Sequence, residues 1–125
     1  MAVRPELRLR LPNSPGALAR ITRILAADQV RVLAFSLESN GLLRFVADNP
    51  SRALAALARE HAAPEQHDVI VTVVASRSID SVLTAAAAAG VNVEYAYASR
   101  LDQDGTVALV LGVEDAQRAA TAAGL

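Results

Sequence analysis

The sequence contains no cysteine, no lysine and no tryptophan, and aromatic residues make up only 3% of its 125 residues. Without cysteine there is no disulfide, no thiolate nucleophile and no cysteine-ligated metal. The few aromatic rings leave little on which nucleic-acid bases could stack, and a net charge of −1 gives no basic excess for phosphate backbones. We therefore expect no nucleic-acid partner.

Long apolar segments are also missing from the chain. Runs such as Ala85 to Ala89 are far too short to span a membrane. Charged residues at Arg4, Glu6 and Arg8 occupy the stretch where a signal peptide needs its apolar segment. We expect a cytoplasmic protein that does not bind membranes.

Apolar residues make up 53% of the chain, mainly alanine, leucine and valine, which is enough for a packed core. The length allows one or two small domains. The apolar patterns predict elements in the order strand, helix, strand, strand, helix, and this order occurs twice. The first set comprises a strand at Glu6–Leu11, a helix that starts at a Ser14 cap and Pro15, strands at Val30–Glu38 and Leu42–Ala47, and a helix from Pro50 that ends before Pro64. The second set comprises a strand at His67–Val74, a helix closed by Gly90, strands at Val91–Ala98 and Thr106–Val113, and a helix at Ala116–Ala123.

The two sets align as an internal repeat. At an offset of 61 residues, Leu18 aligns with Ile79 and Val30 with Val91. The repeat predicts an α+β protein of two ferredoxin-like units, residues 1–66 and 67–125, each with the order βαββαβ and helices on one face of the sheet. No Gly/Ser linker separates the copies, so we expect them to pack as one body. No strand follows the last helix, which leaves the second unit without a closing strand unless a partner chain supplies one.

The turn between the first strand and the first helix is the most distinctive motif. It reads Asn13-Ser14-Pro15-Gly16-Ala17-Leu18. Free amides at a helix N-terminus favour a carboxylate, and Gly16 lets a ligand approach the backbone closely. Asn13 offers both an acceptor and donors. On local grounds the turn is either an anion-binding site or an ordinary capped helix start.

These residues resemble a known family. The run Leu11–Leu18 is similar to the N-x-P-G-x-L turn of ACT domains, and Gly90-Val91-Asn92-Val93 is similar to their G-[IV]-N-[IV] stretch. The segment Glu94-Tyr95-Ala96-Tyr97-Ala98 resembles stand-alone proteins made of two ACT units in tandem. The resemblance covers nearly the whole chain. It implies a regulatory protein without catalytic activity that binds a small ligand, usually an amino acid, where two units meet.

Carried over residue by residue, the resemblance implies one ligand site from both copies. The first copy would contribute Asn13, Pro15, Gly16, Ala17 and Leu18, and the second copy Asn92. Glu94 shares a strand face with Asn92 and is either a partner for the ligand's ammonium group or a solvated strand residue.

The second copy departs from the motif. It has Ser76-Arg77-Ser78-Ile79 where the first has Pro15-Gly16-Ala17-Leu18, so it lacks the glycine and carries a bulky charge. The first copy has Arg31 where the second has Asn92, so a reciprocal site would pair Arg31 with Arg77. We therefore predict one strong ligand site per chain.

Other constellations are weaker. Asp102-Gln103-Asp104-Gly105 lacks the further acidic ligands of a calcium loop and is interpreted as a hairpin turn. His61 and His67 have no obvious third zinc ligand. Because no nucleophile–base pair, metal set or phosphate loop is present, no catalytic residue, metal or cofactor is predicted.

The second predicted strand is apolar on both faces. Phe35 and Leu37 are expected on one side, and Val32 and Ala34 on the other. Helices can cover only one face, so we expect the chain to form a homodimer.

Three functions remain open at this stage. The first is a small-molecule sensor that binds an amino acid. The second is a dimerising regulatory or interaction subunit of a separate metabolic enzyme, with a vestigial ligand site. The third, and weakest, is a small ferredoxin-like enzyme.

Overall fold

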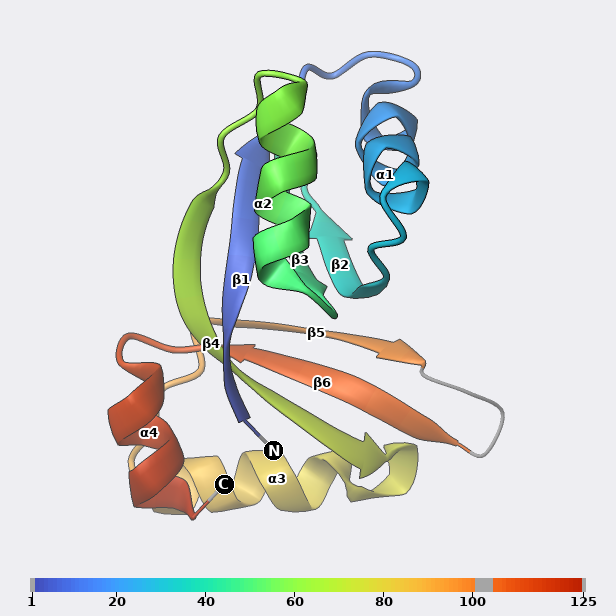
Figure 1. Ribbon diagram of the computed structural model, residues 1–125. Coiled ribbons are helices and arrows are strands. Elements are labelled where there is room, and N and C mark those ends of the chain that lie inside the picture. Colours follow the sequence, from blue (N-terminus) through green and yellow to red (C-terminus); the bar gives the residue numbers. More distant parts are fainter. Residues whose placement is uncertain (1, 101–104, 125) are drawn as a thin grey trace. The chain divides into compact units, whose positions relative to one another are not determined.

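The computed structural model describes residues 2–100 and 105–124, and their fold is α+β (Figure 1). The predicted order of strands and helices is confirmed within these residues. The strands are β1 (Ala2–Arg10), β2 (Val32–Leu37), β3 (Leu42–Ala47), β4 (Glu65–Ala75), β5 (Tyr95–Arg100) and β6 (Thr106–Gly112). The helices are α1 (Ala17–Ala27), α2 (Pro50–Arg59), α3 (Ile79–Ala88), preceded by a 3₁₀ turn at Ser76–Ser78, and α4 (Ala116–Ala123).

The residues divide into two compact units. One unit is Pro5–His67, and the other combines the described residues of 1–4 and 68–125. Strands β1 and β4 are hydrogen-bonded neighbours, and each contributes residues to both units. Each unit therefore contains parts of four strands and two helices, as a ferredoxin-like arrangement requires.

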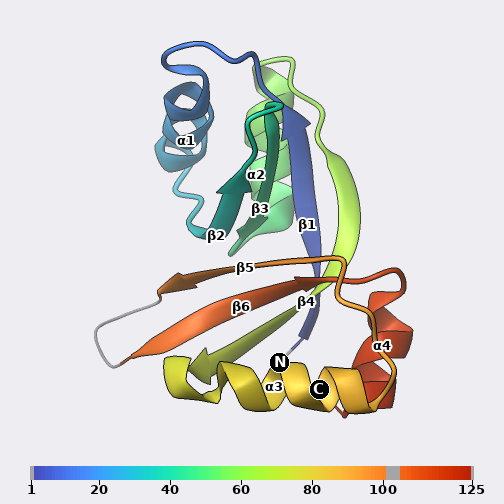
Figure 2. The same ribbon diagram turned by 180° about the vertical axis from the view of Figure 1, so that it is seen from behind.

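The closing strand of the second unit comes from the start of the chain. Val3 on β1 packs against the hydrophobic cluster that includes Ile70 and Leu111. Figures 1 and 2 show the first residues of β1 beside β4, in the place that a strand after α4 would otherwise fill. The second unit is thus closed by this chain's own N-terminal residues, without a strand from a partner chain.

Strand β1 begins four residues earlier than the sequence pattern predicts. The alternation of Leu7 and Leu9 with arginine starts only after Pro5, which has no backbone N–H to donate to a neighbouring strand. The division between the two units also falls at this point, between Arg4 and Pro5. The strand therefore serves one unit before Pro5 and the other from Pro5 onwards.

The core of the first unit lies between α1, α2 and one face of its strands. Its buried residues are Leu7, Ile21, Leu25, Val30, Leu43, Phe45, Ala47, Ala53 and Leu57. Two antiparallel pairings set this face, because β3 pairs with β1 through Leu7–Phe45 and Leu9–Leu43 and with β2 through Phe35–Phe45 and Leu37–Leu43.

The expectation that Val32 and Phe35 lie on opposite faces of β2 is wrong. The register shifts between Val32 and Ala34, so that Val32 lies opposite Ala47 and Phe35 opposite Phe45. A bulge adds one residue to a strand and reverses the alternation beyond it. Val32, Phe35 and Leu37 consequently share the face that the helices cover, although Phe35 and Leu37 remain 48% and 43% exposed.

The core of the second unit is built in the same way. Ile70, Leu109, Leu111, Val113, Ala116 and Ala120 form its buried cluster. On the opposite face of β5 and β6, the rings of Tyr95 and Tyr97 are stacked with centroids 6.4 Å apart. A Cβ atom on Gly112 would lie 2.2 Å from the Tyr95 ring, so the glycine makes room for that ring.

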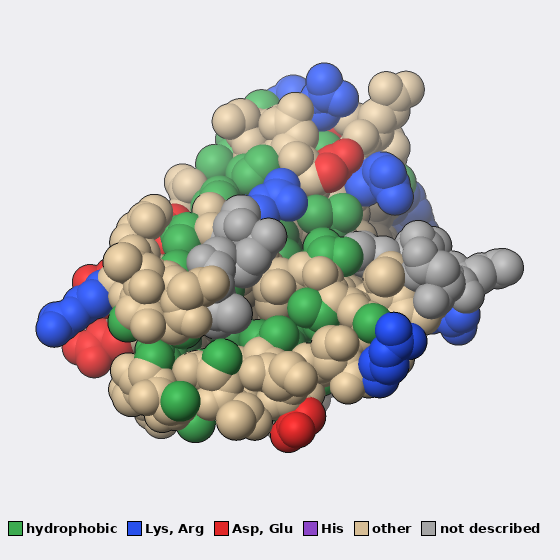
Figure 3. All heavy atoms as spheres, turned by 90° about the horizontal axis from the view of Figure 1, so that it is seen from below, with side chains coloured by type: hydrophobic (Ala, Val, Ile, Leu, Met, Phe, Trp, Pro, Cys, Tyr) green, Lys and Arg blue, Asp and Glu red, His purple; other side chains and the backbone are tan. Residues whose placement is uncertain are grey.

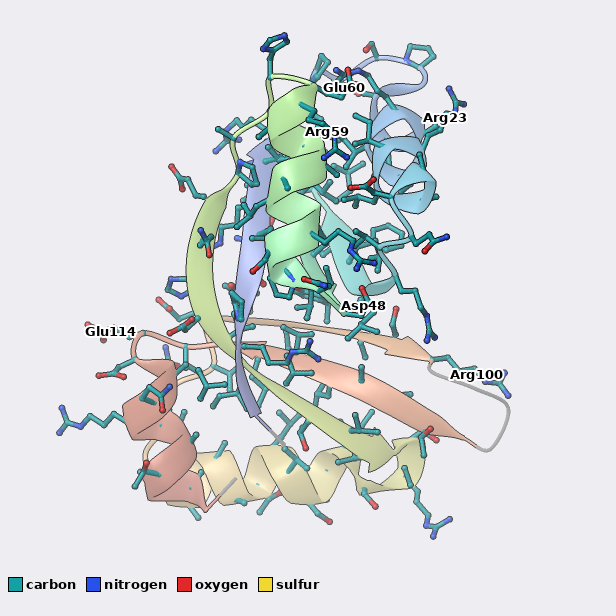
Figure 4. All side chains as sticks on the ribbon, in the orientation of Figure 1. Arg23, Asp48, Arg59, Glu60, Arg100 and Glu114 are labelled. Carbon is teal, nitrogen blue, oxygen red and sulfur yellow. The ribbon has the colours of Figure 1, made fainter. Side chains whose placement is uncertain are left out.

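Two polar contacts connect α1 and its C-cap with the end of α2 in the first unit. Arg59 and Glu60, at the end of α2, are labelled in Figure 4. The Arg59 guanidinium lies 2.6 Å from the carboxylate of Asp28, and the carbonyl of Glu60 accepts a hydrogen bond from Arg20 at 3.5 Å. Both pairs are largely exposed, so each contributes at most about 1 kcal/mol to stability.

On the face that Figure 3 shows, charged side chains form several small groups, and basic and acidic ones adjoin at the left edge. Hydrophobic side chains appear there in small groups among polar and backbone atoms. Within the described residues, no helix is both long and apolar enough to cross a membrane.

Candidate functional site

The turn before α1 has an unusual backbone conformation at Gly16. Its φ angle is +83°, in the left-handed region, and it is the N-cap of a helix that begins at Ala17. The predicted helix start at Ser14 and Pro15 is therefore wrong by two residues. A left-handed residue cannot continue an α-helix, and glycine adopts this conformation without strain.

The first turn of α1 leaves amide groups without partners. The amide of Arg20 donates to the carbonyl of Gly16 at 2.9 Å, and that of Ala17 to Ser14 at 3.3 Å. The amides of Leu18 and Ala19 have no acceptor among the described residues. No side chain caps this end of the helix, and its first turn carries no acidic residue. These amides and the helix dipole therefore favour an external anion.

The hairpin turn between β2 and β3 lies against the same turn. The amide of Leu11 donates to the carbonyl of Gly41 at 2.8 Å. A Cβ atom on Gly41 would lie only 2.3 Å from the carbonyl oxygen of Leu11, and the φ angle of Gly41 is +89°. Glycine at this position therefore allows the hairpin to approach the loop that carries Asn13.

Together these segments form an open pocket of about 590 Å³. Four of the predicted ligand residues line it, namely Asn13, Gly16, Ala17 and Leu18. Pro15 does not line it. The remaining lining residues are Leu11, Pro12, Ser14, Ala19, Thr22, Leu37, Glu38, Ser39 and Gly41. The Asn13 side chain is exposed, so it is accessible to a ligand.

Among the described residues, Glu38 is the single charged side chain that lines this pocket. Its carboxylate is 43% exposed and forms an ion pair with Arg44. The pocket thus combines free amides and the positive end of a helix with a carboxylate. In a zwitterionic amino acid, the carboxylate would match the amides at the helix end, and the ammonium group would match the carboxylate of Glu38. The arrangement therefore suits the main-chain groups of an amino acid.

Asn92 and Glu94 line a different pocket, of about 400 Å³, in the second unit. Their neighbours there include Gly90, Val91, Asp115 and Arg118, as well as Glu114, which Figure 4 labels beside α4. The sequence pattern predicted both residues on a strand at Val91–Ala98. Strand β5 begins only at Tyr95, so both residues lie before it and the prediction is wrong on this point. Both side chains are nevertheless exposed, while Val91 and Val93 pack against the core.

The corresponding turn of the second repeat has a different structure. Ser76–Ser78 form a 3₁₀ turn that leads directly into α3, and the amide of Ile79 donates to the carbonyl of Ser76. The amide of Ser76 is also used, by the carbonyl of Gly105 at 2.9 Å. Asp80 places a carboxylate in the first turn of α3, where it offsets the helix dipole and repels an anion.

Sequence reasoning missed the contribution of the β2–β3 hairpin to the first pocket. Thr22, Leu37, Glu38, Ser39 and Gly41 were not among the predicted ligand residues. The hairpin signal at Ser39-Asn40-Gly41 could have found most of them. If β1 pairs antiparallel with β3, the turn before β3 must lie next to the residues that follow β1.

The other sequence motifs do not add a site. Among the described residues, no group of three His, Cys, Asp or Glu side chains could hold a metal ion, and His61 and His67 belong to none. The interpretation of Asp102–Gly105 as a turn concerns Asp102, Gln103 and Asp104, which lie outside the described residues.

Comparison of the structure with solved proteins identifies the fold. The chain is similar to protein BT0572 from Bacteroides thetaiotaomicron, with a TM-score of 0.82, 25% identity, and coverage of 96% of this chain and 85% of that one. It is also similar to the regulatory subunit of aspartate kinase from Thermus thermophilus, with a TM-score of 0.62, 19% identity, and coverage of 96% and 88%. Aspartokinase alpha and beta subunits match with a TM-score of 0.62, 13% identity, and coverage of 97% and 93%. No family model and no curated protein sequence matches the chain. The chain therefore has an ACT-like fold, as the sequence resemblance implied.

Proposed function

We propose that this protein is a regulatory amino-acid sensor in which residues 1–66 and 67–125 act as tandem ACT units. The observation that carries the proposal is the pocket at the start of α1, which is lined both by Leu18 and Ala19, whose amides have no acceptor among the described residues, and by Glu38. The likeness to regulatory subunits of aspartate kinase supports a regulatory role without catalysis of its own.

In this proposal the ligand carboxylate accepts hydrogen bonds from the amides of Leu18 and Ala19. Gly16 keeps the approach to these amides open because it has no side chain. Asn13 binds the ligand's polar groups, and Glu38 attracts its ammonium group. The participation of Asn92 and Glu94 stays a prediction, which alanine variants of each would test by their effect on affinity.

The test is a thermal melt of the protein with each of the twenty amino acids. A ligand that binds only the folded state adds about 2.7 kcal/mol to the free energy of unfolding at 100 times its dissociation constant. We expect at least one amino acid to raise the melting temperature, and Asn13→Ala to reduce the shift. If no amino acid has an effect, the ligand-sensing function is wrong.

A second function is an interaction subunit of a separate metabolic enzyme, with a vestigial ligand site. The specific observation in its favour is that the similar structures include subunits of a larger enzyme. A protein with this function would show no response to amino acids in the melt but would change the activity of an enzyme that it binds.

We also propose that the protein forms a homodimer. Strands β2 and β5 stand at the two ends of the strand order, and an edge strand offers unpaired backbone groups to another chain. Val73, which is 56% exposed, adds apolar surface. Sedimentation at micromolar concentration should show a dimer, and a species of 13.1 kDa alone would contradict this proposal.

A further inference from the structure

We infer that the amino acid recognised at the first pocket has an uncharged, apolar side chain. This inference rests on the proposed function and adds to it the chemical class of the ligand. It comes from the surface next to the amides of α1, since those amides bind a part that all amino acids share and cannot select among side chains.

A second, apolar hollow adjoins the first pocket. Leu18 and Thr22 line both, so the two hollows are neighbours beside α1. The second hollow is a narrow crevice of about 10 Å³ between α1 and the strands, lined also by Ile21, Leu25, Val32, Phe35, Leu43 and Phe45. Because the crevice is so small, a ligand side chain would lie across its mouth instead of entering the core.

Among the described residues that line the crevice, Thr22 has the one polar side chain, and it does not favour a polar ligand. The hydroxyl of Thr22 donates to the carbonyl of Ala19 at 3.1 Å, so its donor is already used. The other lining residues are aliphatic or aromatic. A charged group placed here would lose water without gaining a partner, which is costly.

Two large apolar side chains are exposed at this place. Phe35, which lines the crevice, is 48% exposed, and Leu37, which lines the first pocket, is 43% exposed. Both face the helix side of β2, because the bulge brings them into register with Phe45 and Leu43. An apolar ligand side chain that lies on them would remove this surface from water.

The charges around the pocket disfavour acidic amino acids. They leave basic amino acids as the alternative to apolar ones. No cationic side chain from the described part of the chain lines either hollow, so the charged group that an acidic side chain would meet there is the carboxylate of Glu38. A basic side chain could pair with Glu38, but in the proposed function that carboxylate attracts the ligand's α-ammonium group in addition to its ion pair with Arg44. Lysine is therefore the competitor that the experiment must include.

The experiment is a calorimetric titration of the whole chain with two matched sets of amino acids. The first set is alanine, 2-aminobutyrate, norvaline and norleucine, which differ by one methylene each. The second compares norleucine with lysine and norvaline with glutamate, which have similar length but carry a charge. We expect affinity to rise up to about fourfold for each methylene. We expect lysine and glutamate to bind at least about tenfold more weakly than their apolar counterparts, because of desolvation of the charge.

Two variants test whether the preference for apolar side chains arises at Phe35 and Leu37. Phe35→Ser and Leu37→Ser should each flatten the rise across the first set while alanine still binds. Leu83→Ser is the control, because Leu83 is an exposed apolar residue of α3 that lines neither hollow. The inference is overturned if lysine or glutamate binds as tightly as norleucine, or if affinity is flat across the first set. If no amino acid binds, the proposed function itself fails.

Discussion

The two repeats begin their first helices in different ways, although the elements around them correspond. In the first repeat Gly16 adopts a left-handed conformation, and the amides of Leu18 and Ala19 are left without partners. In the second repeat the chain passes through a 3₁₀ turn into α3, which uses the amide of Ile79 and places Asp80 in the first turn. The comparison shows how one fold leaves helix amides without partners in one copy and uses them in the other.

The two hairpins also differ, in the surroundings of their glycines. Gly41 and Gly105 both have φ angles near +90°, at +89° and +87°. Gly41 is packed against the carbonyl of Leu11, whereas an added Cβ on Gly105 would meet nothing within 4 Å. Both glycines accept a backbone hydrogen bond from the segment before their own helix, Gly41 from Leu11 and Gly105 from Ser76, but among the described residues only Gly41 is so close to that segment that a side chain would clash. The first hairpin also lines the pocket with the Asn13 loop.

The largest expected effect is on stability, and it tests whether the two hairpins differ in how closely their glycines are packed. Gly41→Ala should lower the free energy of unfolding by about 2–4 kcal/mol, since it adds a backbone clash to the strain of a positive φ angle. Gly105→Ala should cost only about 1–2 kcal/mol, from the strain alone. Urea denaturation of both variants measures the difference, and equal losses would show that the contact with Leu11 does not matter.

The next effect concerns ligand affinity. Gly16→Val should weaken binding by at least about 30-fold, because a β-branched residue is strained at this φ angle and fills the approach to the amides. Gly105→Val is the matched control, with nearly the same φ angle and no neighbour within 4 Å. It should cost similar stability and leave affinity unchanged. Calorimetric titration of a binding amino acid separates these outcomes, and equal affinity losses would be evidence against a site at Gly16.

A third variant makes the first helix start resemble the second. Ala19→Asp places a carboxylate in the first turn of α1, as Asp80 does in α3. Helix stability should rise by about 0.3–1 kcal/mol, while ligand affinity should fall about three- to tenfold through repulsion of the ligand carboxylate. Both effects should shrink at high salt. If stability and affinity rise together, the carboxylate of the ligand does not bind at this helix end.

The smallest effect concerns how the helices end. In the first unit the residues after α1 and α2 that adopt positive φ angles are Gln29 and His61, at 59° and 62°, whereas the second unit uses Gly90 and Gly124. His61→Gly should therefore raise the free energy of unfolding by about 0.5–1 kcal/mol, because glycine relieves the left-handed strain. Denaturation in urea measures the change. A loss of stability would mean that the imidazole makes a contact worth more than the strain.

Much of this fold could be predicted from the sequence. The hairpin signal at Ser39-Asn40-Gly41 located β3 at Leu42–Ala47 to the residue, and the predicted helices begin where α2 and α4 begin, at Pro50 and Ala116. Asn49 and Asp115 each accept a hydrogen bond from the amide three residues later, as a helix cap does. Local signals suffice where the physical cause is itself local.

The rest depends on contacts between distant residues. The closure of the second unit by Val3 could not be predicted, because Pro5 interrupts the strand pattern and the pairing spans more than sixty residues of sequence. The bulge in β2 has no clear sequence signal, and it decides which side of the strand carries Phe35. For the site, the motif identified Asn13 and Gly16, but Glu38 enters only through the pairing of β1 with β3.

The measurement that tests the central claim most directly is the number of ligands bound per chain. Calorimetric titration with a binding amino acid should give one strong site. Asn13→Ala should weaken that site by about 1–3 kcal/mol, because the ligand's polar groups lose a hydrogen-bond partner, and Ser78→Ala in the second repeat should leave it unchanged. Two equal sites per chain, or a loss of affinity in the Ser78→Ala variant alone, would contradict the account and assign the function to the other repeat.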